Sequence, residues 1–163
     1  MKNTAKQNLF GILRIFIGWI FFWSFIDKVW GLGFETAADK AWIVGASPTF
    51  GFLKFATKGP FAGIFQAMAG SAFVDWLFMI GLLSIGLALI FGIGIRIAAY
   101  SGSIMLILMW LAALPPEHNP IIDEHIIYIL VLFILSSVDA GQYLGLGRWW
   151  GERLAVKKNK WLK

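Results

Sequence analysis

The feature that most constrains this chain is a run of twenty residues without a charge, from Trp76 to Ile95. At a rise of about 1.5 Å per residue, a helix of that length spans about 30 Å, the thickness of the hydrocarbon core of a bilayer. Three further segments are largely apolar: Leu9–Ile26, which is interrupted by Arg14, Ile97–Leu114, and a stretch from Pro120 to Ala140 that carries charges near its ends. Only 14% of the residues are charged, against about a quarter in soluble domains. The sequence therefore predicts an all-α membrane protein, a bundle of four transmembrane helices.

The connections between these helices differ in length and composition. The segment Asp27–Asp75 is too long for a turn and contains apolar stretches, so we expect a partly helical cap on the outer side of the bundle. Before the fourth helix, Asn119 is a predicted N-cap with Pro120 in the first helical position. Residues 1–147 would then form the membrane domain, including the cap at 27–75, and residues 148–163 a basic tail.

The charge distribution predicts the orientation in the membrane. One side carries Lys2, Lys6, Arg96 and the basic tail, whereas the other carries the mixed-charge cap and the acidic connection from Glu117 to Glu124. Because basic residues favour the cytoplasmic side, we expect a multi-pass protein of the cell membrane with both termini in the cytoplasm. The tail predicts attraction to membrane lipid. No nucleic-acid module accompanies it, so a nucleic-acid partner is not expected.

The side chains available for chemistry are restricted. The chain has no cysteine, which excludes thiolate nucleophiles, iron–sulfur clusters and cysteine-ligated zinc. His118 and His125 are its two histidines, so no metal site is expected. A four-helix enzyme resembling vitamin K epoxide reductase is disfavoured because it would require cysteines.

Two helices each carry a pair of ionisable residues fourteen positions apart. Arg14 and Lys28 share one face of the first helix, since fourteen residues make about four turns. His125 and Asp139 share a face of the fourth in the same way. If the two antiparallel faces meet, Arg14 and Asp139 form a structural ion pair that sets the helix register, with Arg96 as a second candidate partner for Asp139.

At the outer end of the same two faces, Lys28 and His125 would converge on one cavity beneath the cap, with Tyr128 one turn deeper. Two cationic groups placed together are tolerated best where an anion binds. The competing interpretation, weighed equally, is that both side chains extend to the interface as ordinary amphipathic residues. Asp27 or Glu117 would then neutralise them from the loops.

The pattern of these residues resembles the DoxX/DoxD family of small four-helix membrane proteins. The first helix is similar in Arg14, Gly18, the following aromatic run and Lys28, and the stretch Gly86 to Arg96 resembles the family's second and third helices. The last helix is most similar, in Asp123-Glu124-His125, Tyr128, Asp139-Ala140-Gly141 and Leu144-Gly145-Leu146. The family often continues Gly-Leu-Asp, where this chain reads Gly145-Leu146-Gly147-Arg148, so no role is assigned to an acid there.

The long first connection and the Asp-Glu-His motif resemble the DoxD side of the family, the membrane subunit of thiosulfate:quinone oxidoreductase. This implies an oxidoreductase subunit that oxidises thiosulfate or a related reduced sulfur compound and reduces membrane quinone as its second substrate. Lys28, His125 and Tyr128 would be catalytic. The binding residues would be Phe21 and Phe25, as an apolar wall for quinone, and Lys54 and Lys58, as cations for the oxyanion.

The alternative is a non-enzymatic DoxX-like protein, either an assembly partner of a redox complex or a carrier of small solutes or lipid. Under both hypotheses a second subunit or a homo-oligomer is left open as a partner.

Overall fold

Three helices of the computed structural model are long and apolar enough to cross a membrane: α1 (Thr4–Trp30), α3 (Ala72–Phe91) and α4 (Ile95–Ala112). A fourth apolar helix, α5 (Glu124–Ser137), has 14 residues. The structure describes residues 4–117 and 119–162, with only the backbone of residues 155 and 160, and these ranges contain helices but no strand. Lys2 and Lys163 lie outside them. The chain therefore has the all-helical build of a multi-pass membrane protein.

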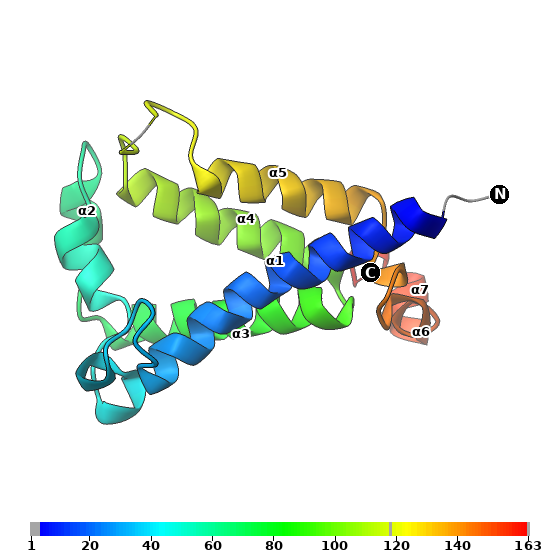
Figure 1. Cartoon of the computed structure of the whole chain (residues 1–163), viewed down its shortest axis with the longest axis horizontal. Helices are drawn as coiled ribbons and strands as arrows, with labels where there is room; N and C mark the ends of the chain where they lie inside the picture. Colours follow the sequence, from blue (N-terminus) through cyan, green and yellow to red (C-terminus); the bar gives the residue numbers. More distant parts are fainter. Residues whose placement is uncertain (1–3, 118, 163) are drawn as a thin grey trace.

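The four long helices run roughly side by side (Figure 1). α1 packs chiefly against α3, α3 against α4, and α4 against α5. We call the end where α1 begins and where residues 92–94 join α3 to α4 the tail end. The opposite end, where α1 and α4 finish, is the loop end. α1 and α5 are neighbours towards the tail end and diverge towards the loop end (Figure 1).

The core lies along the inner faces of these helices. Phe21 of α1, Met79 and Leu89 of α3 and Leu132 of α5 are buried in one cluster. The small residues of α4 face inward, since Ala98, Ala99, Gly102 and Ser103 are all buried. Large apolar side chains face outward instead, among them Phe16 (65% exposed), Leu77 (62%) and Ile104 (60%). An apolar exterior of this extent suits a lipid surrounding.

The segment between α1 and α3 is partly helical. It contains the 3₁₀ turns η1 (Ala38–Lys40) and η2 (Trp42–Val44), the π-helix η3 (Phe52–Ala56) and the short helix α2 (Ala62–Ala67). Asp75, in the first turn of α3, holds this segment by accepting hydrogen bonds from the Ser47 hydroxyl (2.8 Å) and from the Thr49 backbone N–H (3.2 Å). Lys58 donates its backbone N–H to the carbonyl of Ala112 (3.0 Å). The segment is thus fastened to α3 and α4 at the loop end.

The C-terminal segment folds back against the tail end. It comprises η4 (Ala140–Gln142), α6 (Gly147–Gly151), α7 (Leu154–Lys158) and η5 (Lys160–Leu162). Val156 is buried, the ring of Trp161 lies 5.2 Å from that of Tyr100 on α4, and the Trp150 indole N–H donates to the carbonyl of Leu162. The basic C-terminal segment is therefore folded, and apolar and aromatic contacts hold it against the tail end of the bundle.

Candidate functional site

Lys28, a predicted catalytic cation, is already paired. It lies near the end of α1, and its Nζ is 3.1 Å from Oε2 of Glu35. The Lys28 side chain is 14% exposed, whereas that of Glu35 is 71% exposed. The neutralising carboxylate therefore comes from the loop after α1, but from Glu35 rather than from Asp27 or Glu117.

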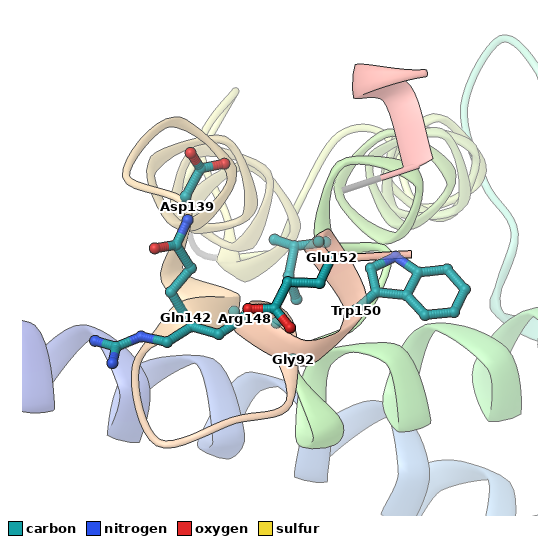
Figure 2. Close-up of a pocket in the computed structure, with 10 residues that line it drawn as sticks. Gly92, Asp139, Gln142, Arg148, Trp150 and Glu152 are labelled. Atoms are coloured by element: carbon teal, nitrogen blue, oxygen red, sulfur yellow. The ribbon is translucent and has the colours of Figure 1, made fainter. Parts of the chain in front are cut away.

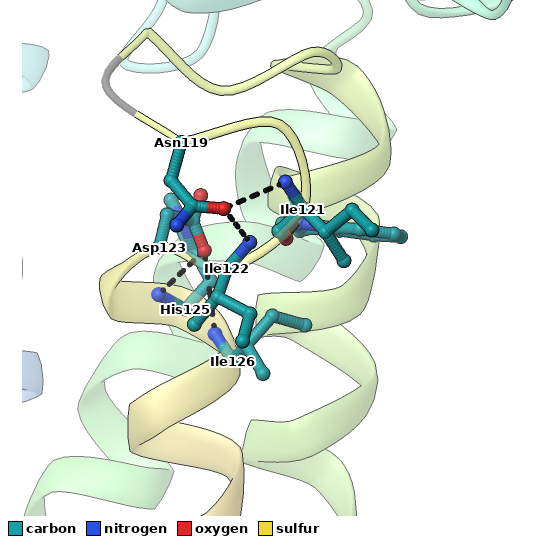
Figure 3. A network of polar contacts seen from close by, with 7 residues as sticks. Asn119, Ile121, Ile122, Asp123, His125 and Ile126 are labelled. Carbon is teal, nitrogen blue, oxygen red and sulfur yellow. Dashed lines mark hydrogen bonds and ion pairs between the residues drawn. The ribbon is translucent and has the colours of Figure 1, made fainter.

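His125 is also paired, with Asp123 at the start of α5 (Figure 3). Its Nδ1 lies 3.0 Å from Oδ2 of Asp123, and its backbone N–H donates to Oδ1 (3.1 Å). Asp123 is thus the N-cap, so the prediction that Asn119 caps the helix is wrong. Asn119 instead accepts hydrogen bonds from the backbone N–H groups of Ile121 and Ile122 and orders the turn before α5.

The predicted cavity between Lys28 and His125 is not assembled, because the end of α1 and the start of α5 diverge at the loop end (Figure 1). The other residues of that site are also dispersed. Phe21 is buried in the core, and Phe25 and Tyr128 pack against it. Lys54 and Lys58 are exposed in and after η3.

One group of potential metal ligands occurs among the described residues. Donor atoms of Asp123, Glu124 and His125 lie within 4.8 Å of one another. Both carboxylate oxygens of Asp123 already serve the N-cap and the His125 ring, so the group does not offer a free set of three ligands. These three residues are better explained as the N-terminal cap and first turn of α5.

Arg14 and Asp139 do not pair with each other, so the predicted ion pair between these two residues is wrong. Arg14 is fully buried and donates from Nη2 to the carbonyl of Leu144 (2.9 Å) and from Nη1 to that of Gly141 (3.5 Å). Asp139 pairs with the second candidate, Arg96, at 3.7 Å, and both of those side chains are more than a third exposed. Arg14 therefore joins α1 to the loop after α5 through backbone acceptors.

A hollow of about 350 Å³ opens on the other face of α1, towards the loop end. We call it the aromatic slot; it is lined by Trp19, Ile20, Trp23, Ser24, Asp27, Phe34 and Glu35. The rings of Trp19 and Trp23 stack with their centroids 5.7 Å apart, and Phe34 meets Trp23 edge-on at 5.2 Å. Its volume is within the range of about 300–1,000 Å³ that is usual for ligand sites.

The loop that closes the slot is held by Asp27. This buried carboxylate accepts three backbone hydrogen bonds, from Phe34 (3.3 Å), Glu35 (3.0 Å) and Thr36 (2.9 Å). Three donors on one carboxylate fix the loop against the end of α1 and set the positions of the Phe34 ring and the Glu35 carboxylate. One side of the slot is therefore bounded by a hydrogen-bonded loop.

Comparisons with protein-family models, curated proteins and solved structures returned no match. The ligand class of the slot must therefore be inferred from the residues that line it. Its indole and phenyl walls suit a flat ring or an isoprenoid chain that enters from lipid. The Ser24 hydroxyl can donate a hydrogen bond, and the exposed carboxylate of Glu35 can accept one.

Reasoning from the sequence overlooked this slot because it followed the charged face of α1. Trp19 and Trp23 are four residues apart and so share a face, and two aromatic residues on an outward face were the available signal. The contribution of Phe34 and Glu35 from the loop had no such signal, since it depends on how Asp27 folds the chain back.

Proposed function

We propose that this chain is a four-helix membrane protein that binds a quinone or quinol in the aromatic slot and acts as the quinone-side subunit of a membrane oxidoreductase. The observation that carries the proposal is the slot itself, with its stacked aromatic walls, its polar edge and its position on a helix face that borders lipid. The resemblance to DoxD supports the same ligand class.

The polar groups of the slot match both redox states of the ligand. Ser24 would donate a hydrogen bond to a quinone carbonyl oxygen, and the Glu35 carboxylate would accept one from a quinol hydroxyl. Reduction of a quinone consumes two electrons and two protons, and Glu35, paired with Lys28 at 3.1 Å, is exposed enough to pass protons from water. The electrons would come from the oxidation of two thiosulfates to tetrathionate, or of a related sulfur compound.

The oxidation step belongs to a partner subunit in this proposal. The expected convergence of Lys28 and His125 was the argument for oxidising the sulfur compound within this chain, and these residues lie at diverging helix ends. Lys54 and Lys58 remain exposed at the loop end, where they would draw a dianion towards the complex.

The membrane arrangement proposed is four spans with the tail end in the cytoplasm. The 14 residues of α5 cover about 21 Å, and the apolar residues just before and after it would complete the crossing. Arg96, Arg148, Arg153 and Lys157 gather at the tail end, which is the cytoplasmic distribution of basic residues.

A non-enzymatic lipid carrier or assembly partner is the second candidate. It is favoured by the polar edge of the slot, because the exposed Glu35 carboxylate and the Ser24 hydroxyl also suit lipids whose headgroups donate hydrogen bonds. This alternative predicts that the slot binds its ligand but that no electrons are transferred to the ligand.

The deciding experiment uses a photoreactive short-chain quinone with the purified full chain in detergent, followed by peptide mapping. We expect labelling within residues 19–35 and, for Trp23→Leu, roughly tenfold weaker binding from the lost ring contacts. Trp161→Leu, at the opposite end, is the matched control and should bind normally. Labelling elsewhere, or equal affinity in both variants, would reject the slot. Thiosulfate-dependent quinone reduction, with and without membrane extract, then separates an oxidoreductase subunit from a carrier.

A further inference from the structure

A second hollow, of about 290 Å³, lies at the tail end (Figure 2), whereas the aromatic slot lies towards the loop end. The residues around it come from the α3–α4 turn, the loop after α5, and α6: Gly92, Ile95, Asp139, Gly141, Gln142, Gly147, Arg148, Trp150, Gly151 and Glu152. We call it the tail-end pocket. It uses none of the residues of the proposed quinone site.

The inner wall of the tail-end pocket is close-packed backbone. A Cβ atom at Gly141 would collide with the carbonyl of Gly92, and one at Gly147 would collide with the carbonyl of Gly141. Glycine is therefore required at both positions, and the wall cannot be filled by side chains. The pocket owes its shape to this packing, with Arg14 directly behind Gly92.

The charges around the pocket balance but are not all paired. Asp139 is compensated by Arg96 at 3.7 Å. Arg148 and Glu152 are four residues apart in and just after α6, a spacing that commonly gives an ion pair. Within residues 4–117 and 119–162, however, neither forms one. In Figure 2 the Arg148 guanidinium and the Glu152 carboxylate do not point towards each other.

Arg148 and Glu152 are both exposed, so water solvates them when the pocket is empty, and a ligand that carries both charges can pair with each of them. An ion of a single sign would meet a like charge, whereas a zwitterion would meet a complementary charge at each end. The pocket also lies where α3 ends and α4 begins, the depth at which a membrane helix passes into the headgroup layer. Trp150, which is partly exposed, adds an aromatic contact typical of that layer.

We propose that the tail-end pocket binds the headgroup of a zwitterionic phospholipid with a primary ammonium, of the phosphoethanolamine type. Arg148 pairs with the phosphate and Glu152 with the ammonium, while the acyl chains follow the lipid-facing side of α4. A primary ammonium is preferred over a choline because only the former can donate a hydrogen bond to the Glu152 carboxylate.

The test measures lipid retention by native mass spectrometry of the purified full chain, with no quinone present, so that it is independent of the proposed function. Phosphatidylethanolamine, phosphatidylcholine and phosphatidylglycerol are offered at equal concentration. We expect the ethanolamine lipid to be retained preferentially, and Glu152→Gln and Arg148→Gln each to lower its affinity by roughly tenfold, the effect of one charged hydrogen bond.

Arg153→Gln is the matched control. The Arg153 guanidinium lies 4.1 Å from the centre of the Trp149 ring, outside the pocket lining, so this variant should keep the wild-type preference. Equal retention of the glycerol or choline lipid by the wild type would overturn the proposal, as would an unchanged preference in both pocket variants or an equal loss in the control. Displacement by free glycerophosphoethanolamine at the same concentration would assign the pocket to a soluble ligand and reject a lipid one.

Discussion

Arg14 is a buried cation whose described acceptors are backbone carbonyls. The loop that supplies them contains two non-glycine residues in the left-handed region, Asp139 (φ 48°) and Leu144 (φ 52°), a conformation that side chains disfavour. The carbonyl of Leu144 is also the closer of the two acceptors. The guanidinium therefore stabilises a loop conformation that would otherwise be unfavourable, and the loop in turn closes α1 onto the end of α5.

We predict that Arg14→Met lowers the free energy of unfolding in detergent by about 1.5–3 kcal/mol, because the buried carbonyl of Gly141 and the partly buried carbonyl of Leu144 both lose a charged donor. Arg96→Met is the control at the same end of the bundle. It removes only a half-exposed ion pair, which is worth less than about 1 kcal/mol. Denaturant or thermal unfolding followed by circular dichroism gives both values. A larger loss for Arg96→Met, or for Asp139→Ala, would show that the ion pair matters more than the carbonyl contacts.

A second prediction concerns Asp27, whose carboxylate holds three backbone N–H groups of the loop after α1. In Asp27→Ala these amides lose their acceptor, so hydrogen exchange at residues 34–36 should accelerate and quinone binding in the slot should weaken. Asp39→Ala, in the exposed η1 turn, should change neither. Unaltered exchange at residues 34–36 in Asp27→Ala would mean that the loop is ordered by other contacts.

At the scale of elements, α5 depends most on its N-terminal cap. α5 is the shortest of the four long helices. The Asp123 side chain accepts hydrogen bonds from two backbone N–H groups in the first turn of α5, those of His125 and Ile126. The same carboxylate orients the His125 ring. The Asp-Glu-His motif that resembles a family signature therefore has a structural role in this chain at the point where α5 begins.

We expect Asp123→Ala to cost about 1 kcal/mol of stability, the usual value for the loss of an N-cap, and to increase hydrogen exchange in the first turn of α5. Glu124→Ala, at the adjacent exposed position, removes a charge without removing the cap and should cost less. Equal effects of the two substitutions would indicate helix-dipole electrostatics rather than capping.

At the scale of the whole molecule, the number of membrane crossings can be tested directly, since the chain has no cysteine of its own. Single substitutions Asp39→Cys, Glu117→Cys and Lys158→Cys each introduce one reactive thiol. With a membrane-impermeant thiol reagent, we expect the first two to react from one side of the membrane and the third from the other. Labelling of Lys158→Cys from the same side as Glu117→Cys would show that α5 does not cross.

Some features of this structure could be predicted from the sequence, and others could not. Hydropathy predicted the three long apolar helices α1, α3 and α4, and Arg14, which was expected to make an inter-helix contact, is buried. Helical periodicity failed for Lys28 and His125, because a shared helix face does not determine the angle at which two helices cross. The acceptors of Arg14 were not predictable either, since they depend on a loop with left-handed residues. The aromatic slot was missed for a similar reason, because half of it is supplied by a loop folded onto α1.

α1 and α3 come closest where two glycines face each other. A Cβ atom at Gly18 would lie 2.8 Å from the backbone nitrogen of Ile90, and one at Gly86 would lie 2.8 Å from that of Phe22. The helices cross obliquely (Figure 1), so they meet backbone to backbone in one region and separate on either side of it. Any side chain at Gly18 or Gly86 would therefore force the two helices apart, so the spacing between α1 and α3 depends on both glycines.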